Sequence, residues 1–105
     1  MSVYIGTQVI PTPGNLQALL ALGERYNNLV KKLGGTPVGG WTVALGEGQG
    51  TLALLVSYPD LAAYQAATQK ALADAEFVKF VADVGPLVAG TNSSVYTPAP
   101  TSALQ

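Results

Sequence analysis

The segment from Thr51 to Tyr58 carries no charged side chain on either of its alternating faces. It follows a glycine-rich turn at Gly46–Gly50 and is rich in residues that favour β-strands. In a strand, one face would present Leu52, Leu54 and Val56, and the other Ala53, Leu55 and Ser57. An antiparallel strand with one wet face should alternate apolar and polar residues. We therefore expect both faces of this strand to be buried.

Three other segments share this strand character, and three helical patterns separate the four strands. The further strands are predicted over Val3–Ile10, Val38–Leu45 and, more weakly, Asn92–Thr97. Apolar residues three and four apart predict helices over Asn15–Leu33, Pro59–Leu72 and Asp74–Val88. Ser57 or Asp60 is a candidate N-cap for the second helix, and Gly85 and Pro86 predict a kink or an early end in the third.

The charged residues avoid these strands. Of eleven Asp, Glu, Lys and Arg residues, ten lie in or at the ends of predicted helices, and Glu47 lies in the glycine-rich turn. They make up 10% of the chain, against roughly 25% in ordinary globular domains. A second layer from the same chain would also bury the sheet, but four strands and two or three helices leave no residues for it. We expect helices on one face and a second copy on the other, as a homodimer with the possibility of higher assembly.

Composition excludes several classes of function. The net charge of −1 provides no basic surface for nucleic acid or an anionic membrane. The chain has no cysteine and no histidine, so we expect no metal and no cofactor. No apolar run approaches the roughly 20 residues of a membrane span, and no secretory signal is evident, so a cytoplasmic protein is expected.

The predicted order is strand, helix, strand, strand, broken helix, strand. This is the α+β, ferredoxin-like βαββαβ arrangement, with a four-stranded antiparallel sheet. We expect a single domain over residues 1–98 and a flexible C-terminal tail over residues 99–105.

Several segments in this order are similar to those of one known family. They are "TPG" at Thr12–Gly14, "GGTPVGGWTVALG" at Gly34–Gly46, "LLVSYPDLAAY" at Leu54–Tyr64 and "DAEFVKFVADVGPLV" at Asp74–Val88. Together they resemble the NIPSNAP family of the dimeric α/β-barrel superfamily, over Val3 to Pro98. The resemblance implies a homodimer whose two sheets pack face to face into a barrel. It also implies a pocket in each protomer between the sheet and its helices or loops.

The resemblance also implies polar side chains at alternate positions of the first strand and a histidine in the third. Here those positions hold Ile5, Thr7, Val9 and Leu54. We therefore expect an unusually apolar pocket. The wider superfamily includes isomerases, cyclases and monooxygenases, and a shared fold does not select one reaction among them.

The candidate ligand-binding residues are Tyr4, Thr7, Trp41, Tyr58 and Tyr64. Tyrosine and tryptophan combine a large apolar body with one hydrogen-bonding tip, which suits a small hydrophobic or aromatic ligand. The same side chains could instead fill the core or the dimer interface. No catalytic residue is assigned. Two alternatives stay open: a non-catalytic interaction module, and a small cofactor-independent isomerase or cyclase that uses Tyr4 or Tyr58.

Overall fold

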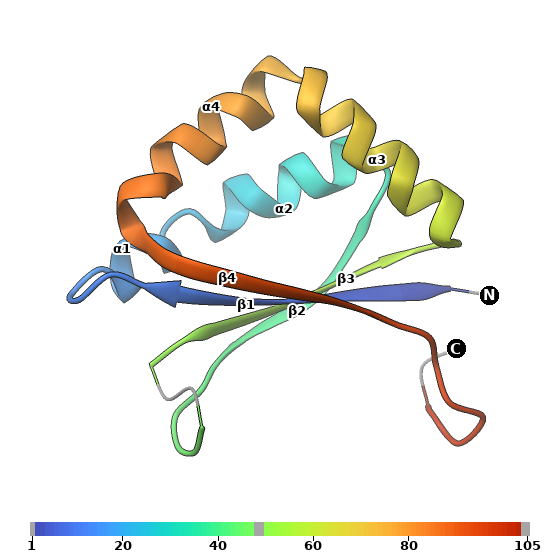
Figure 1. Cartoon of the computed structure of the whole chain (residues 1–105), viewed down its shortest axis with the longest axis horizontal. Coiled ribbons are helices and arrows are strands. Elements are labelled where there is room, and N and C mark those ends of the chain that lie inside the picture. The colour runs from blue at the N-terminus through green and yellow to red at the C-terminus, as the bar shows by residue number, and fades with distance from the viewer. Residues whose placement is uncertain (1, 48–49, 104–105) are drawn as a thin grey trace.

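The computed structural model describes residues 2–47 and 50–103. Its elements are β1 (Val3–Pro11), α1 (Leu16–Leu20), α2 (Gly23–Lys32), β2 (Thr36–Thr42), β3 (Leu52–Tyr58), α3 (Leu61–Ala73), α4 (Ala75–Val84), the short 3₁₀ helix η1 (Gly85–Leu87) and β4 (Val88–Tyr96). The strands form one antiparallel sheet in the order β2-β3-β1-β4. Helices α2, α3 and α4 lie on one side of it (Figure 1). The predicted α+β, ferredoxin-like fold is confirmed.

Strand register divides the sheet residues between two faces. Ile5 pairs with Val56 and Thr7 with Leu54, and these residues face the helices. Gly6 pairs with Leu55 on the opposite face, which we call the open face. Ile5 and Val56 are 6% and 5% exposed, so the helix-side face forms the floor of the core.

The helix layer completes that core with side chains of unequal size. Leu29 of α2 and Phe80 of α4 are large and buried, whereas α3 contributes Ala67 and Ala71. The two alanines lie one turn apart on the buried side of α3. They fill little of the space between this helix and the sheet.

Ion pairs join the outer surfaces of α2 and α4. Arg25 Nη1 lies 2.8 Å from Asp83 Oδ2, and Lys32 Nζ lies 2.8 Å from Asp74 Oδ2 and 3.3 Å from Glu76 Oε1. Exposed pairs of this kind contribute about 0–1 kcal/mol each. No strand of the described chain carries a charged side chain, which confirms the predicted separation of charge from the sheet.

The predicted first helix is wrong in one respect, because it is two helices. A tight turn at Ala21 and Leu22 separates α1 from α2, with the Leu22 N–H bonded to the Leu19 carbonyl at 3.0 Å. Gly23, a poor helix former, begins the second segment.

The other helix boundaries agree more closely with the sequence. Asp60 caps α3 by accepting a hydrogen bond from the Ala63 N–H at 2.7 Å. The chain leaves the α-helical conformation at Gly85 and Pro86, as predicted, and continues as η1.

Two strands differ from the predicted ranges. The structure places β2 over Thr36–Thr42 rather than Val38–Leu45, with a register shift between Pro37 and Gly39. Proline is tolerated there because β2 is an edge strand. β4 is longer than expected, since it pairs with β1 along nearly its whole length. Residue propensity alone gave little indication of the extra length, because β4 is held as a strand by its hydrogen bonds to β1.

The β2–β3 connection and the C-terminal segment both extend to the side of the sheet away from the helices (Figure 1). Residues 48–49 of the predicted glycine-rich turn and residues 104–105 of the predicted tail lie outside the described residues. Within the tail, the Ser102 N–H donates to the Ala99 carbonyl at 2.9 Å. None of the helices in residues 2–47 and 50–103 combines the length and the apolar character needed to cross a bilayer.

Candidate functional site

A cavity of about 240 Å³ lies between the sheet and the helix layer. We call it the helix–sheet cavity. Its lining residues are Ile5, Thr7, Tyr26, Val30, Leu33, Val56, Tyr58, Tyr64, Ala67, Thr68, Ala71, Leu72, Phe77 and Ser93. None of them is charged. The space exists where α3 presents alanines to the sheet, and it matches the apolar pocket expected from the sequence.

Six of the lining residues carry a hydroxyl group, from β1, β3, β4, α2 and α3. On the sheet, the Thr7 and Ser93 hydroxyl oxygens are 3.0 Å apart and share a hydrogen bond. On α3, the Thr68 hydroxyl donates to the Tyr64 carbonyl at 3.1 Å. The Tyr58 and Tyr64 rings pack with their centroids 5.4 Å apart and their planes tilted by 60°. Hydrogen-bonding groups therefore border an otherwise apolar space.

The cavity changes the acidity of two of its phenols. Burial raises the pKa of Tyr26 to about 12, and the nearby Tyr58 and Tyr64 phenols add to the shift. Burial, followed by the neighbouring Tyr64 phenol, also raises the pKa of Tyr58. Both groups are therefore protonated at neutral pH and are able to donate hydrogen bonds. A raised pKa disfavours either as a general base.

Replacing Tyr26 with phenylalanine should remove the part of the tyrosinate absorbance that appears near pH 12. The unfolded chain releases this proton near pH 10, so folding raises the pKa. The corresponding stability is fully present below pH 10 and is lost as the pH rises toward 12. In alkaline urea unfolding, the wild type should therefore lose up to about 3 kcal/mol more than Tyr26→Phe over this interval.

Tyr96→Phe is the matched control for that titration. Tyr96 is 53% exposed, so this variant should keep the step near pH 12. An unchanged alkaline titration in Tyr26→Phe would show that Tyr26 is not the buried phenol.

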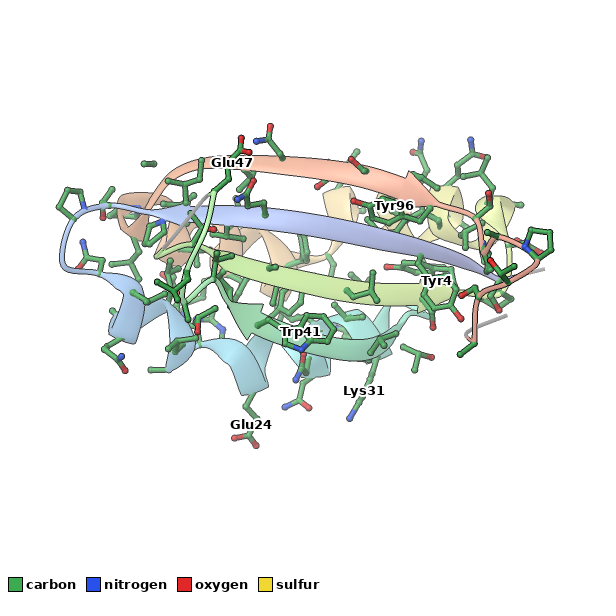
Figure 2. All side chains as sticks on the ribbon, turned by 90° about the horizontal axis from the view of Figure 1, so that it is seen from below. Tyr4, Glu24, Lys31, Trp41, Glu47 and Tyr96 are labelled. Atoms are coloured by element: carbon green, nitrogen blue, oxygen red, sulfur yellow. The ribbon has the colours of Figure 1, made fainter. Side chains whose placement is uncertain are left out.

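Trp41 and Tyr4 lie elsewhere, on the open face (Figure 2). Trp41 is 56% exposed and its ring covers Gly39, where an added Cβ would lie 3.0 Å from Cη2. The Tyr96 ring covers Gly6 in the same way, and an added Cβ would overlap it. Leu55 pairs with both glycines. Trp41, Leu55 and Tyr96 therefore form an apolar band across the open face.

The structure divides the five candidate residues between two places. Thr7, Tyr58 and Tyr64 line the helix–sheet cavity, whereas Tyr4 and Trp41 lie on the open face. Alternation along β1 already separates Tyr4 from Thr7, since an even and an odd position point to opposite faces. Tyr26 was missed, because its place in a helical stripe of leucines and valines made it look like a core residue.

Comparison with known proteins gives the family. The NIPSNAP family model matches residues 11–103, nearly the whole chain. The chain belongs to the NIPSNAP family. This confirms the resemblance found in the sequence. Among curated proteins, no match is found.

Solved structures show how widely this NIPSNAP fold is shared. A NIPSNAP family protein from Agrobacterium tumefaciens is 15% identical, with full coverage of both chains and a TM-score of 0.90. An uncharacterised NIPSNAP domain protein from Burkholderia xenovorans is 19% identical, covering 97% of this chain and 98% of its own, with a TM-score of 0.83. Rv0793 from Mycobacterium tuberculosis is 18% identical, covering 98% of this chain and 100% of its own, with a TM-score of 0.70. At these identities the likeness establishes the fold alone.

Proposed function

We propose that this NIPSNAP protein binds a small, uncharged, largely apolar molecule in the helix–sheet cavity, and that it does so as a homodimer. The observation that carries the proposal is the lining of that cavity, which combines apolar side chains with hydroxyl groups and has no charge. A charged ligand would lose its hydration there without gaining a partner of opposite charge. An apolar ligand with one hydroxyl or carbonyl group would suit both parts of the lining.

The cavity volume indicates the size of the ligand that the space would hold. An apolar cavity of about 150 Å³ holds benzene, so in proportion 240 Å³ suits a molecule of about ten non-hydrogen atoms. That is the size of a two-ring aromatic compound.

A second copy of the chain is the partner that best suits the open face. The strands on this face carry no charge, and the apolar band lies uncovered. A twofold axis brings the same patch against itself, so an uncharged face avoids like-charge repulsion in a dimer. The β2–β3 connection extends to the same side of the sheet (Figure 1) and contains Leu45, which is 85% exposed.

The position of Trp41 also favours a second candidate function, a module whose role is association alone. Its exposed ring lies outside the helix–sheet cavity and would be covered in the dimer. In that case the protein would dimerise but bind no ligand, so a ligand titration separates the two candidates.

The test is a fluorescence titration with 2-naphthol, a two-ring compound with one hydroxyl group. We expect saturable binding at about one molecule per chain, weakened at least tenfold by Thr7→Leu. That variant places extra volume in the cavity and removes the hydroxyl shared with Ser93. Gln69→Leu adds the same side chain on the exposed side of α3 and should bind as the wild type does. Equal affinity in the wild type and Thr7→Leu would contradict the proposed site.

A further inference from the structure

A second cavity lies close to the first. Its volume is about 280 Å³, and it lies on the helix side of β2 and β3, beneath α1 and the beginning of α2. Tyr26 and Val56 line both cavities. Val56 belongs to the sheet floor, and Tyr26 reaches this boundary from α2. A side chain that borders both spaces is their common wall.

We infer that the Tyr26 ring is a partition that sets the largest ligand the helix–sheet cavity accepts. This inference rests on the proposed function. With the ring in place, the ligand is confined to a space suited to one or two aromatic rings. Without the ring, the two spaces join into one cavity of roughly twice the volume of either. Tyr26 is then a residue that determines specificity for size.

Packing against α4 holds the partition in place. The Tyr26 and Phe80 ring centroids are 6.1 Å apart, with their planes tilted by 36°. The Arg25 guanidinium lies 5.2 Å from the Phe80 centroid and pairs with Asp83. Phe80 is 7% exposed, so Tyr26 packs against a fixed side chain. Tyr26 is itself half-buried, so its ring is held between Phe80 and the two cavities.

Glycines explain why the second space is open. Gly23 of α2 and Gly40 of β2 line it without side chains. A Cβ added at Gly23 would meet no atom within 4 Å, and the backbone there has no positive φ. Gly23→Leu adds a side chain at the lining of the second cavity, with no clash at its Cβ, and we expect that side chain to take up part of the space. This variant makes it possible to fill the second space while leaving the first unchanged.

The experiment compares 2-naphthol with N-phenyl-1-naphthylamine, an uncharged fluorescent probe of about seventeen non-hydrogen atoms, which is too large for 240 Å³ in proportion to benzene. The wild type should bind 2-naphthol and exclude the larger probe. Tyr26→Phe should also exclude the larger probe, because it keeps the ring. Tyr26→Ala should bind the larger probe at least tenfold more tightly than the wild type does. Adding Gly23→Leu to Tyr26→Ala should reverse that gain, because it refills part of the joined cavity.

The outcomes distinguish the partition from the proposed function. If the wild type does not bind 2-naphthol, the proposed function fails and the partition fails with it. If the wild type binds 2-naphthol but Tyr26→Ala binds the larger probe no more tightly than the wild type does, only the partition is wrong. Equal binding of both probes by the wild type also contradicts the partition. Should Tyr26→Ala be unfolded by circular dichroism, Tyr26→Leu, which keeps an apolar contact with Phe80, replaces it in the same comparison.

Discussion

Replacing Leu55 with arginine is expected to convert the proposed dimer into a monomer. Leu55 lies at the centre of the apolar band, and the strand neighbours on both sides are glycines, Gly6 and Gly39. A twofold interface would contain the substitution twice, so two unpaired cations would be buried close together. We expect a loss of about 4 kcal/mol in association, or about a thousandfold in the dissociation constant. Sedimentation equilibrium of the variant measures this directly.

The expected monomer should remain folded, because Leu55 lies on the face opposite the helix-side core. Circular dichroism checks this point. Ala62→Arg introduces the same charge on the exposed surface of α3 and should leave the dimer intact. A wild-type protein that is monomeric at high concentration, or a Leu55→Arg variant that dimerises as the wild type does, would overturn the proposed interface.

The Phe80→Ala substitution should cause a large loss of folding stability. Phe80 is 7% exposed and packs against Tyr26 of α2 beneath the Arg25 guanidinium. Removing a buried phenylalanine ring usually costs about 3–5 kcal/mol, from lost transfer energy and the cavity left behind. A small domain has a total stability of only about 5–15 kcal/mol. Urea unfolding should show a much lower midpoint, or a chain that is already largely unfolded.

Val81→Ala is the matched control, since Val81 follows Phe80 in α4 but is 51% exposed. The loss of folding stability in Val81→Ala should stay below about 1 kcal/mol. Similar losses in the two variants would mean that Phe80 does not hold α4 onto α2 and the sheet.

The sequence predicted the sheet better than the site. The apolar pattern of Thr51–Tyr58 indicated burial on both faces, and the helices do cover the face of Leu52, Leu54 and Val56. Periodicity also located the helical segments, because a period near 3.6 is a property of neighbouring residues. It did not show the break at Ala21 and Leu22, where one turn changes the direction of the chain without interrupting the apolar pattern.

Residue type led to the candidate ligand-binding residues, and for this reason only some of them gather in one place. Thr7, Tyr58 and Tyr64 come from three elements that the antiparallel register and the packing of α3 bring around one cavity. Trp41 has the same chemical character but lies on the opposite face. The register shift in β2 between Pro37 and Gly39 lies just before Trp41. Simple alternation along β2 therefore did not predict reliably on which face of the sheet the Trp41 side chain lies.

The sequence by itself determined which chemistry the sheet would lack. With no cysteine, no histidine and no charge on any predicted strand, the sheet could contribute only apolar, hydroxyl and amide side chains to a site. The family resemblance implied a pocket between the sheet and its helices, but only the tertiary structure decided which residues line it. A cavity is the space left after side chains from distant segments have packed together. Here it depends on small residues, such as Ala67 and Ala71, facing the sheet where larger ones would fill the gap. That space depends on packing between segments far apart in the chain, so no local pattern in the sequence encodes it.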